Sequence, residues 1–106
     1  MISIQEDPSK LVLKTGSTTL TFDKASGKAT LQKKMLLLWN KTPVEFPLSE
    51  IDDIAVKSDV DGLSGASIHH SVMHRRNGEI TVLTTEEAKD AAETVKKLRG
   101  FVGLQV

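Results

Sequence analysis

The pattern of hydrophobic and polar positions changes character once along the chain. Up to about Leu83, short runs of alternating apolar and polar residues are separated by turn signals, and alternation with a period of two is typical of half-buried β-strands. After that point, apolar residues recur at helical spacing. The pattern therefore predicts a mainly β protein, with strands over about residues 2–83 and one amphipathic helix over about residues 85–100.

Short turn sequences separate the predicted strands. Gly16-Ser17 is a Gly-X pair suited to a two-residue type II′ turn, Ser26-Gly27 marks the next turn, and Asn77-Gly78 is the strongest hairpin signal in the chain. Pro47 indicates an edge position or a bend in its strand, because proline cannot donate to a sheet ladder. Ser58–Gly65 holds two Asp and two Gly, which predicts a polar, mobile loop.

The segment Lys28–Trp39 is long for a strand. Strict alternation would turn Lys33 inward, so we expect a bulge or bend near Lys33-Lys34. Five consecutive large apolar residues then cover both faces of the strand, so one face needs cover from the helix, the second sheet or another subunit. We predict a homodimer or ring formed through Met35, Leu36, Leu37, Leu38 and Trp39.

The C-terminal helix has recognisable signals at both ends. Thr84 with Glu87 three residues later forms a candidate capping box, and Gly100 is a candidate end of the helix. Alanines in the middle of the apolar stripe would let the helix lie close to a sheet. The predicted buried stripe comprises Ala88, Ala91, Ala92, Val95, Leu98 and Val102.

Two sequence features carry a family resemblance. The segment Phe46–Ile54 is similar to a recurring bacterial Pro-Leu-x-x-Ile segment that enters a second sheet, and the Asn77-Gly78 hairpin is followed by the predicted helix. On these features the chain resembles the pleckstrin-homology-like (PH-like) superfamily, especially its small bacterial PH-like and GRAM-like members. Unlike the helix of the eukaryotic branch, this helix has no Trp; the sole Trp is Trp39.

The resemblance implies a fold and a domain organisation. The expected fold is mainly β, α+β by content: a seven-stranded antiparallel, partly open PH-like barrel of two sheets, capped by one C-terminal helix. The expected organisation is a single PH-like domain over residues 1–106. A length of 106 residues and a mass of 11.6 kDa suit one core.

Composition excludes several classes of function. Fourteen basic and fourteen acidic residues give zero formal charge, whereas nucleic-acid-binding domains are usually basic. Without cysteine, there are no disulfides, cysteine metal sites or cysteine nucleophiles. No apolar run is long enough to span a bilayer, and the N-terminus does not resemble a signal peptide. We therefore predict a cytoplasmic protein that does not bind nucleic acid.

The neutral total hides an uneven charge distribution. Residues 1–41 carry seven Lys and three acids, whereas residues 42–66 carry one Lys and six acids. Lysines near an anionic membrane can each contribute about 1 kcal/mol, but the first hairpin lacks the Lys/Arg-x-Arg motif of phosphoinositide-binding PH domains. A solvated strand face is the favoured interpretation, and the alternative is an anionic-lipid surface formed by Lys24, Lys28, Lys33 and Lys34.

The three histidines lie within six residues, at His69, His70 and His74. On a strand, His70 and His74 share a face about 13 Å apart, which is too far for one metal ion, and His69 points to the other face. We interpret them as ordinary strand histidines that can make this patch weakly pH-sensitive.

A calcium loop at Ser58–Gly62 fails at its two most demanding positions, where Lys57 and Ile68 stand. Gly-x-Ser-x-Gly and phosphate-binding glycine motifs are absent from the sequence. Asp52 and Asp53 are consecutive and point in opposite directions on a strand. We therefore predict no catalytic site, no metal site and no cofactor.

These observations favour a non-catalytic interaction module that binds protein partners or assembles with itself, because exposed strand edges offer sites for β-strand addition. The alternative is peripheral binding to an anionic membrane surface through the Lys-rich face.

Overall fold

The computed structural model describes residues 2–16, 18–33 and 44–104. The chain divides into two compact units, residues 1–50 and residues 51–106, and each is described by itself. The prediction of a single domain over 1–106 stays a prediction. In the described ranges the first unit has five strands: β1 (Ser3–Glu6), β2 (Lys10–Lys14), β3 (Thr18–Asp23), β4 (Lys28–Lys33) and β5 (Val44–Pro47).

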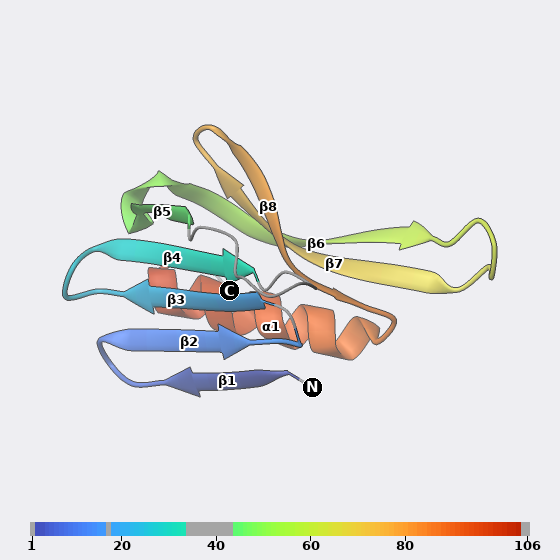
Figure 1. Ribbon diagram of the computed structural model, residues 1–106, viewed down its shortest axis with the longest axis horizontal. Helices are drawn as coiled ribbons and strands as arrows, with labels where there is room; N and C mark the ends of the chain where they lie inside the picture. The colour runs from blue at the N-terminus through green and yellow to red at the C-terminus, as the bar shows by residue number, and fades with distance from the viewer. Residues whose placement is uncertain (1, 17, 34–43, 105–106) are drawn as a thin grey trace, which may run out of the picture. The chain divides into compact units, whose positions relative to one another are not determined.

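The five strands of the first unit form one antiparallel sheet in chain order (Figure 1). Strands β2 and β3 pair directly, since Lys14 pairs with Thr19 and the Thr15 N–H donates to the Thr18 carbonyl at 2.9 Å. The type II′ turn predicted at Gly16-Ser17 includes residue 17, which is outside the described residues. Strand alternation places one side-chain set on a buried face, as predicted. That set comprises Leu11, Leu13, Leu20, Phe22, Ala29, Leu31 and Phe46.

Pro47 ends β5, which is an edge strand of this sheet. The prediction of an edge position is therefore confirmed, and its reason is that an edge strand leaves one row of N–H groups without a ladder partner. A 3₁₀ turn, Leu48–Glu50, follows and leads into the second sheet. The Pro-Leu-x-x-Ile segment thus does enter a second sheet, beginning at Ile51.

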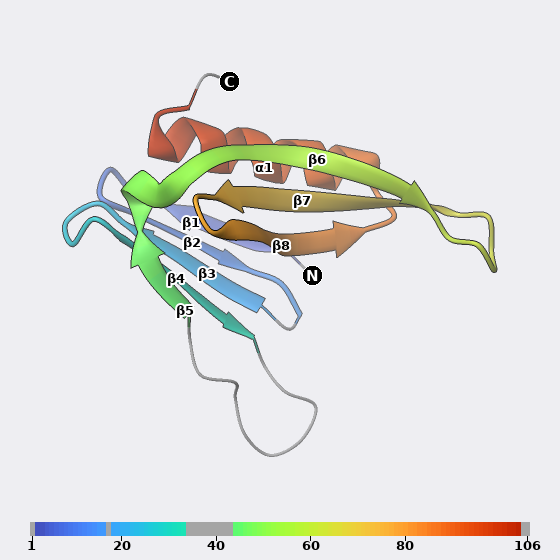
Figure 2. The same ribbon diagram turned by 90° about the horizontal axis from the view of Figure 1, so that it is seen from above.

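The second unit contains a three-stranded antiparallel sheet and one helix. The strands are β6 (Ile51–Val60), β7 (Ser67–Arg75) and β8 (Gly78–Thr85), in the order β6-β7-β8. The helix α1 (Ala88–Val102) packs on this sheet (Figure 2), and the Ser71 hydroxyl of β7 donates to the Ala91 carbonyl at 3.1 Å.

The helix buries a stripe that overlaps the predicted one. Ala91, Val95 and Leu98 are buried as predicted, whereas Ala88 and Ala92 are exposed. Thr94 and Phe101 are buried instead. The buried face is therefore rotated about the helix axis, away from Ala88 and Ala92 and toward Thr94 and Phe101. The helix also continues through Gly100, the predicted end, to Val102.

The predicted capping box is wrong. Thr84 lies within β8, where it is paired with His70, so it cannot act as a helix cap. The residue before the helix is Glu87, which makes no side-chain capping bond. The Thr85 hydroxyl accepts a hydrogen bond from the Glu87 N–H at 3.0 Å instead.

Two other boundaries differ from the sequence prediction. Arg75 pairs with Gly78, so the β7–β8 turn consists of Arg76 and Asn77, and Gly78 begins the next strand. Strand β6 extends to Val60, so the first residues of the predicted loop Ser58–Gly65 are strand. In both places strand pairing across the ladder overrides the local turn signal.

At the coarse level the predicted fold is confirmed: the described chain is mainly β, with antiparallel strands in two sheets and a C-terminal helix. The strand number is eight in the described residues rather than seven, and neither sheet closes on itself into a barrel. The bulge predicted near Lys33-Lys34 and the strand Met35–Trp39 lie at or beyond the end of β4, and residues 34–43 are outside the described residues.

The helix ends at Gly103, whose φ is 85°. This left-handed conformation lets the Leu104 N–H donate to the Arg99 carbonyl at 2.9 Å and is strained for any residue with a Cβ. Replacing Gly103 with alanine is expected to lower the free energy of unfolding by about 1 kcal/mol, measured by urea denaturation. Gly100→Ala, inside the helix, is the control and should be neutral or stabilising; equal losses at both positions would contradict the cap.

Candidate functional site

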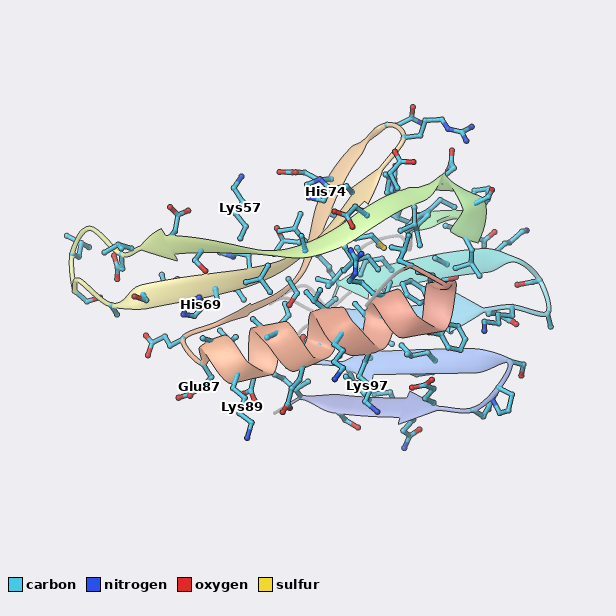
Figure 3. All side chains as sticks on the ribbon, turned by 180° about the vertical axis from the view of Figure 1, so that it is seen from behind. Lys57, His69, His74, Glu87, Lys89 and Lys97 are labelled. Carbon is cyan, nitrogen blue, oxygen red and sulfur yellow. The ribbon has the colours of Figure 1, made fainter. Side chains whose placement is uncertain are left out.

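Two of the histidines lie on one face of the three-stranded sheet and are held by residues of β8. The His70 Nδ1 is 3.0 Å from the Thr84 hydroxyl, and the His74 Nδ1 is 3.2 Å from a carboxylate oxygen of Glu79. His69 lies on the opposite face, where its Nδ1 is 2.7 Å from the hydroxyl of Ser58 on β6 (Figure 3). The strand placement and the facing of all three histidines are as predicted.

Each histidine uses its Nδ1 for a cross-strand neighbour, because strand pairing places that neighbour directly opposite. In the described ranges, no group of three or more His, Asp or Glu side chains comes together in a way that could hold a metal ion. These contacts give the histidines a role in strand pairing.

Lys57 joins this face from β6. It is paired with His70 in the ladder, and its Nζ lies 3.9 Å from Glu79. Its side chain is largely exposed and extends away from the sheet (Figure 3). Since both partners are exposed, this ion pair contributes little to stability, and Lys57 is free to turn toward another carboxylate.

An ion pair between β6 and the helix was not visible in the sequence. The Arg99 guanidinium donates to the Asp53 carboxylate and also to the Ile54 carbonyl at 2.9 Å. The hydrogen bond from Arg99, followed by one from the Ile54 backbone, lowers the pKa of Asp53 below its ordinary value of 3.8. Arg99 therefore covers the first half of β6, near Ile54.

The β6–β7 loop is ordered around one carboxylate. Asp61 accepts hydrogen bonds from the Leu63 N–H at 3.1 Å and the Ser64 hydroxyl at 2.8 Å, and these bonds lower the pKa of Asp61. The Asp61 N–H donates to the Ala66 carbonyl at 2.8 Å. Because this acidic side chain is used to fix the loop, the connection is a structured turn built on an Asx motif.

The distal end of the β6–β7 hairpin projects past the third strand. The last pair between β7 and β8 is His69 with Thr85, whereas β6 and β7 remain paired up to Val60 with Ser67. Beyond His69 the sheet is thus a two-stranded ribbon (Figure 1). Val60 on this ribbon is 68% exposed and Leu63 in its loop is 100% exposed, whereas Val56, opposite Ser71 in the three-stranded part, is 39% exposed.

The structure separates the described lysines of the candidate lipid surface. Lys24 and Lys28 lie at the β3–β4 turn, and Lys28 forms an ion pair with Glu45 at 3.2 Å. Lys33 ends β4, about 16 Å along the strand from Lys28 and on the other face by strand alternation. Lys34 and the predicted self-association strand, Met35 to Trp39, lie outside the described residues.

Comparisons of the chain with protein-family models, with curated proteins and with solved structures gave no match. In the part of the chain that the structure describes, no helix has the length and apolar character needed to cross a membrane.

The strand character of residues 58–60 was not predicted from the sequence. The turn-forming residues of Ser58–Gly65 indicate a loop from Ser58 onward, although β6 continues through Val60. The available signal was the alternation of Val56, Ser58 and Val60 with Lys57 and Asp59, which is the two-residue period of a strand.

Proposed function

We propose that the protein is a non-catalytic interaction module with a PH-like fold, which binds protein partners or a second copy of itself through the open edge of β6. The observation that carries this proposal is the open edge of β6, along which Val56 and Val60 are exposed, with Leu63 exposed in the loop beyond it. An edge strand presents backbone N–H and C=O groups in the geometry that a further strand needs.

The order of elements supports the PH-like part of the proposal. A meander of antiparallel strands is followed by a three-stranded antiparallel sheet and a C-terminal helix that packs on it. The segment Pro47–Ile51 is the connection between the two sheets, which is the place that the resemblance implies for it.

The chemistry of the described side chains supports a binding role over catalysis. The histidines are used in cross-strand contacts, and Asp53 and Asp61 are held by Arg99 and by the β6–β7 loop. The exposed apolar groups of the ribbon, by contrast, have no such internal use. On the open edge of β6, Val56 and Val60 are exposed beside Lys57 and Asp59, and a mixed apolar and charged edge of this kind suits a partner strand with a complementary pattern.

A photo-cross-linking amino acid at Val60 tests the proposal in cells that express the full chain. We expect Val60 to form polypeptide adducts, identified by mass, in several-fold higher yield than the same group placed at Ser26. Ser26 is a matched control because it is exposed in a turn of the other unit.

Two results would contradict the proposal. One is a lack of polypeptide adducts at Val60, or equal yields at Val60 and Ser26. The other is co-sedimentation of the protein with vesicles of anionic phospholipid at low salt, provided that this binding depends on the lysines. Its loss when glutamine replaces Lys24, Lys28, Lys33 and Lys34 would support the lipid-binding alternative instead.

A further inference from the structure

The exposed half of β6 has a sequence that is complementary to itself in antiparallel pairing. Residues 56–60 read Val-Lys-Ser-Asp-Val, so the order of apolar, charged and polar residues is the same from both ends, with the sign of the charge reversed. When two copies pair about Ser58, Lys57 of each copy faces Asp59 of the other, and Val56 of each faces Val60. Opposite charges and apolar pairs directly across a ladder stabilise it.

We infer that two copies of the chain pair through residues 56–60 of β6, joining their three-stranded sheets into one six-stranded antiparallel sheet around a two-fold axis at Ser58. This inference rests on the proposed function and names the second copy as the partner. A two-fold axis is the usual symmetry of homodimers, because one self-complementary patch then serves both subunits.

The structure leaves this edge available for pairing. Strand β6 is at the edge of its sheet, and all five residues from 56 to 60 are exposed. Val56 and Val60 lie on the same face of the strand, at 39% and 68% exposure. Pairing would therefore form two Val56–Val60 contacts, one on each side of the axis, and remove their apolar surface from water.

Lys57 and Asp59 share the other face of β6. Lys57 makes only a 3.9 Å contact with Glu79, and Glu79 also lies 3.2 Å from His74. A Lys57 side chain can therefore turn to Asp59 of the second copy while Glu79 keeps a partner. The two symmetric ion pairs determine which alignment the strands take.

The neighbouring alignments are less favourable. Pairing centred on Lys57 or Asp59 brings like charges together at the axis, and pairing centred on Val56 sets Asp53 against Asp59. Pairing centred on Ala55 sets Lys57 against Asp53, but Arg99 already binds Asp53 and the Ile54 carbonyl. Arg99 thus blocks the first half of β6 and leaves residues 56–60 as the pairing segment.

The small size of the contact sets the expected strength. Five residues from each copy bury much less surface than a standard protein interface, which buries roughly 1,600 Å². The dimer is therefore expected to be transient, populated at high micromolar concentration and dissociated on dilution.

Charge reversal tests the alignment by sedimentation equilibrium of the full chain. The wild type is expected to approach twice the 11.6 kDa monomer mass at high concentration. Lys57→Asp places two like-charge pairs in the dimer, and so does Asp59→Lys, so each should weaken dimerisation about tenfold. The double variant K57D/D59K should restore it, and a mixture of the two single variants should form a heterodimer.

Glu79→Gln is the matched control for Lys57→Asp. It removes the intrachain partner of Lys57 but no residue of the pairing segment, so it should leave dimerisation unchanged. Circular dichroism checks that each variant is folded. A wild-type mass equal to the monomer at high micromolar concentration overturns the inference, as does a double variant no better than the single ones. If Val60 then still cross-links to other polypeptides, the proposed function stands without the dimer; if it forms no polypeptide adducts, both fail.

Discussion

Replacing Leu98 with alanine is expected to lower the free energy of unfolding by about 3 kcal/mol. Leu98 is fully buried, at 0% exposure, in the stripe of α1 that also contains Ala91 and Val95. The loss combines the transfer of its methyl groups from the core with the cavity left behind, because close-packed neighbours relax only in part.

Urea denaturation followed by circular dichroism measures this loss. Lys97→Ala is the matched control, since the adjacent Lys97 is exposed on the same helix (Figure 3) and its substitution should change the free energy of unfolding by less than about 0.5 kcal/mol. A Leu98→Ala variant as stable as the wild type would show that the helix does not pack on its sheet through this stripe.

Replacing Arg99 with methionine is expected to cost about 2 kcal/mol. Methionine keeps the apolar stem but removes the hydrogen bonds to the Asp53 carboxylate and the Ile54 carbonyl. The side chain of Arg99 is 24% exposed and that of Asp53 is 51% exposed, so solvent screening reduces the ionic part of this energy. Most of the lost free energy therefore comes from the charge-assisted hydrogen bond between the Arg99 guanidinium and the Ile54 carbonyl.

The same pair gives a pH dependence with a definite sign. Because the pKa of Asp53 is lower in the folded state than its ordinary 3.8, its stabilising effect is complete above that value and is lost as the pH falls through the folded pKa. Asp53→Asn should therefore cost about 1 kcal/mol at neutral pH, after allowing for its exposure, and the difference from the wild type should shrink as the pH falls below 3.8.

Asp52→Asn is the control for this pH series, because Asp52 is exposed beside Asp53 and no contact with Arg99 involves it. Urea denaturation at a series of pH values compares the two variants. A constant difference between Asp53→Asn and the wild type across the acid range would show that the Asp53 charge does not stabilise the fold.

Much of the local structure could be predicted from the sequence because it depends on neighbouring residues. Alternation of Leu11 and Leu13, or of Leu20 and Phe22, matches the two-residue period of a strand with one buried face. Pro47 predicts an edge for the covalent reason that it has no N–H. The spacing of Ala91, Val95 and Leu98 likewise predicts the buried stripe of the helix.

The candidate site could be predicted only in part. The histidines were correctly placed on a strand, with His70 and His74 on one face. Their partners Ser58, Thr84 and Glu79 were not predicted, because each is brought opposite by the pairing of β6, β7 and β8. The lysines of the lipid alternative look close together in the sequence, but an extended strand separates Lys28 from Lys33.

The sequence was sufficient to predict the mainly β pattern, the C-terminal helix and an edge or bend at Pro47, because each depends on residues close together in the chain. The use of these segments depends on the tertiary structure. It extended β8 through Thr84 at the expense of the helix cap, brought Arg99 to Asp53 from a position 46 residues away, and left residues 56–60 on an exposed edge. Each of these outcomes depends on which segments pair or pack with one another, and the period of a single strand or helix does not specify its partner.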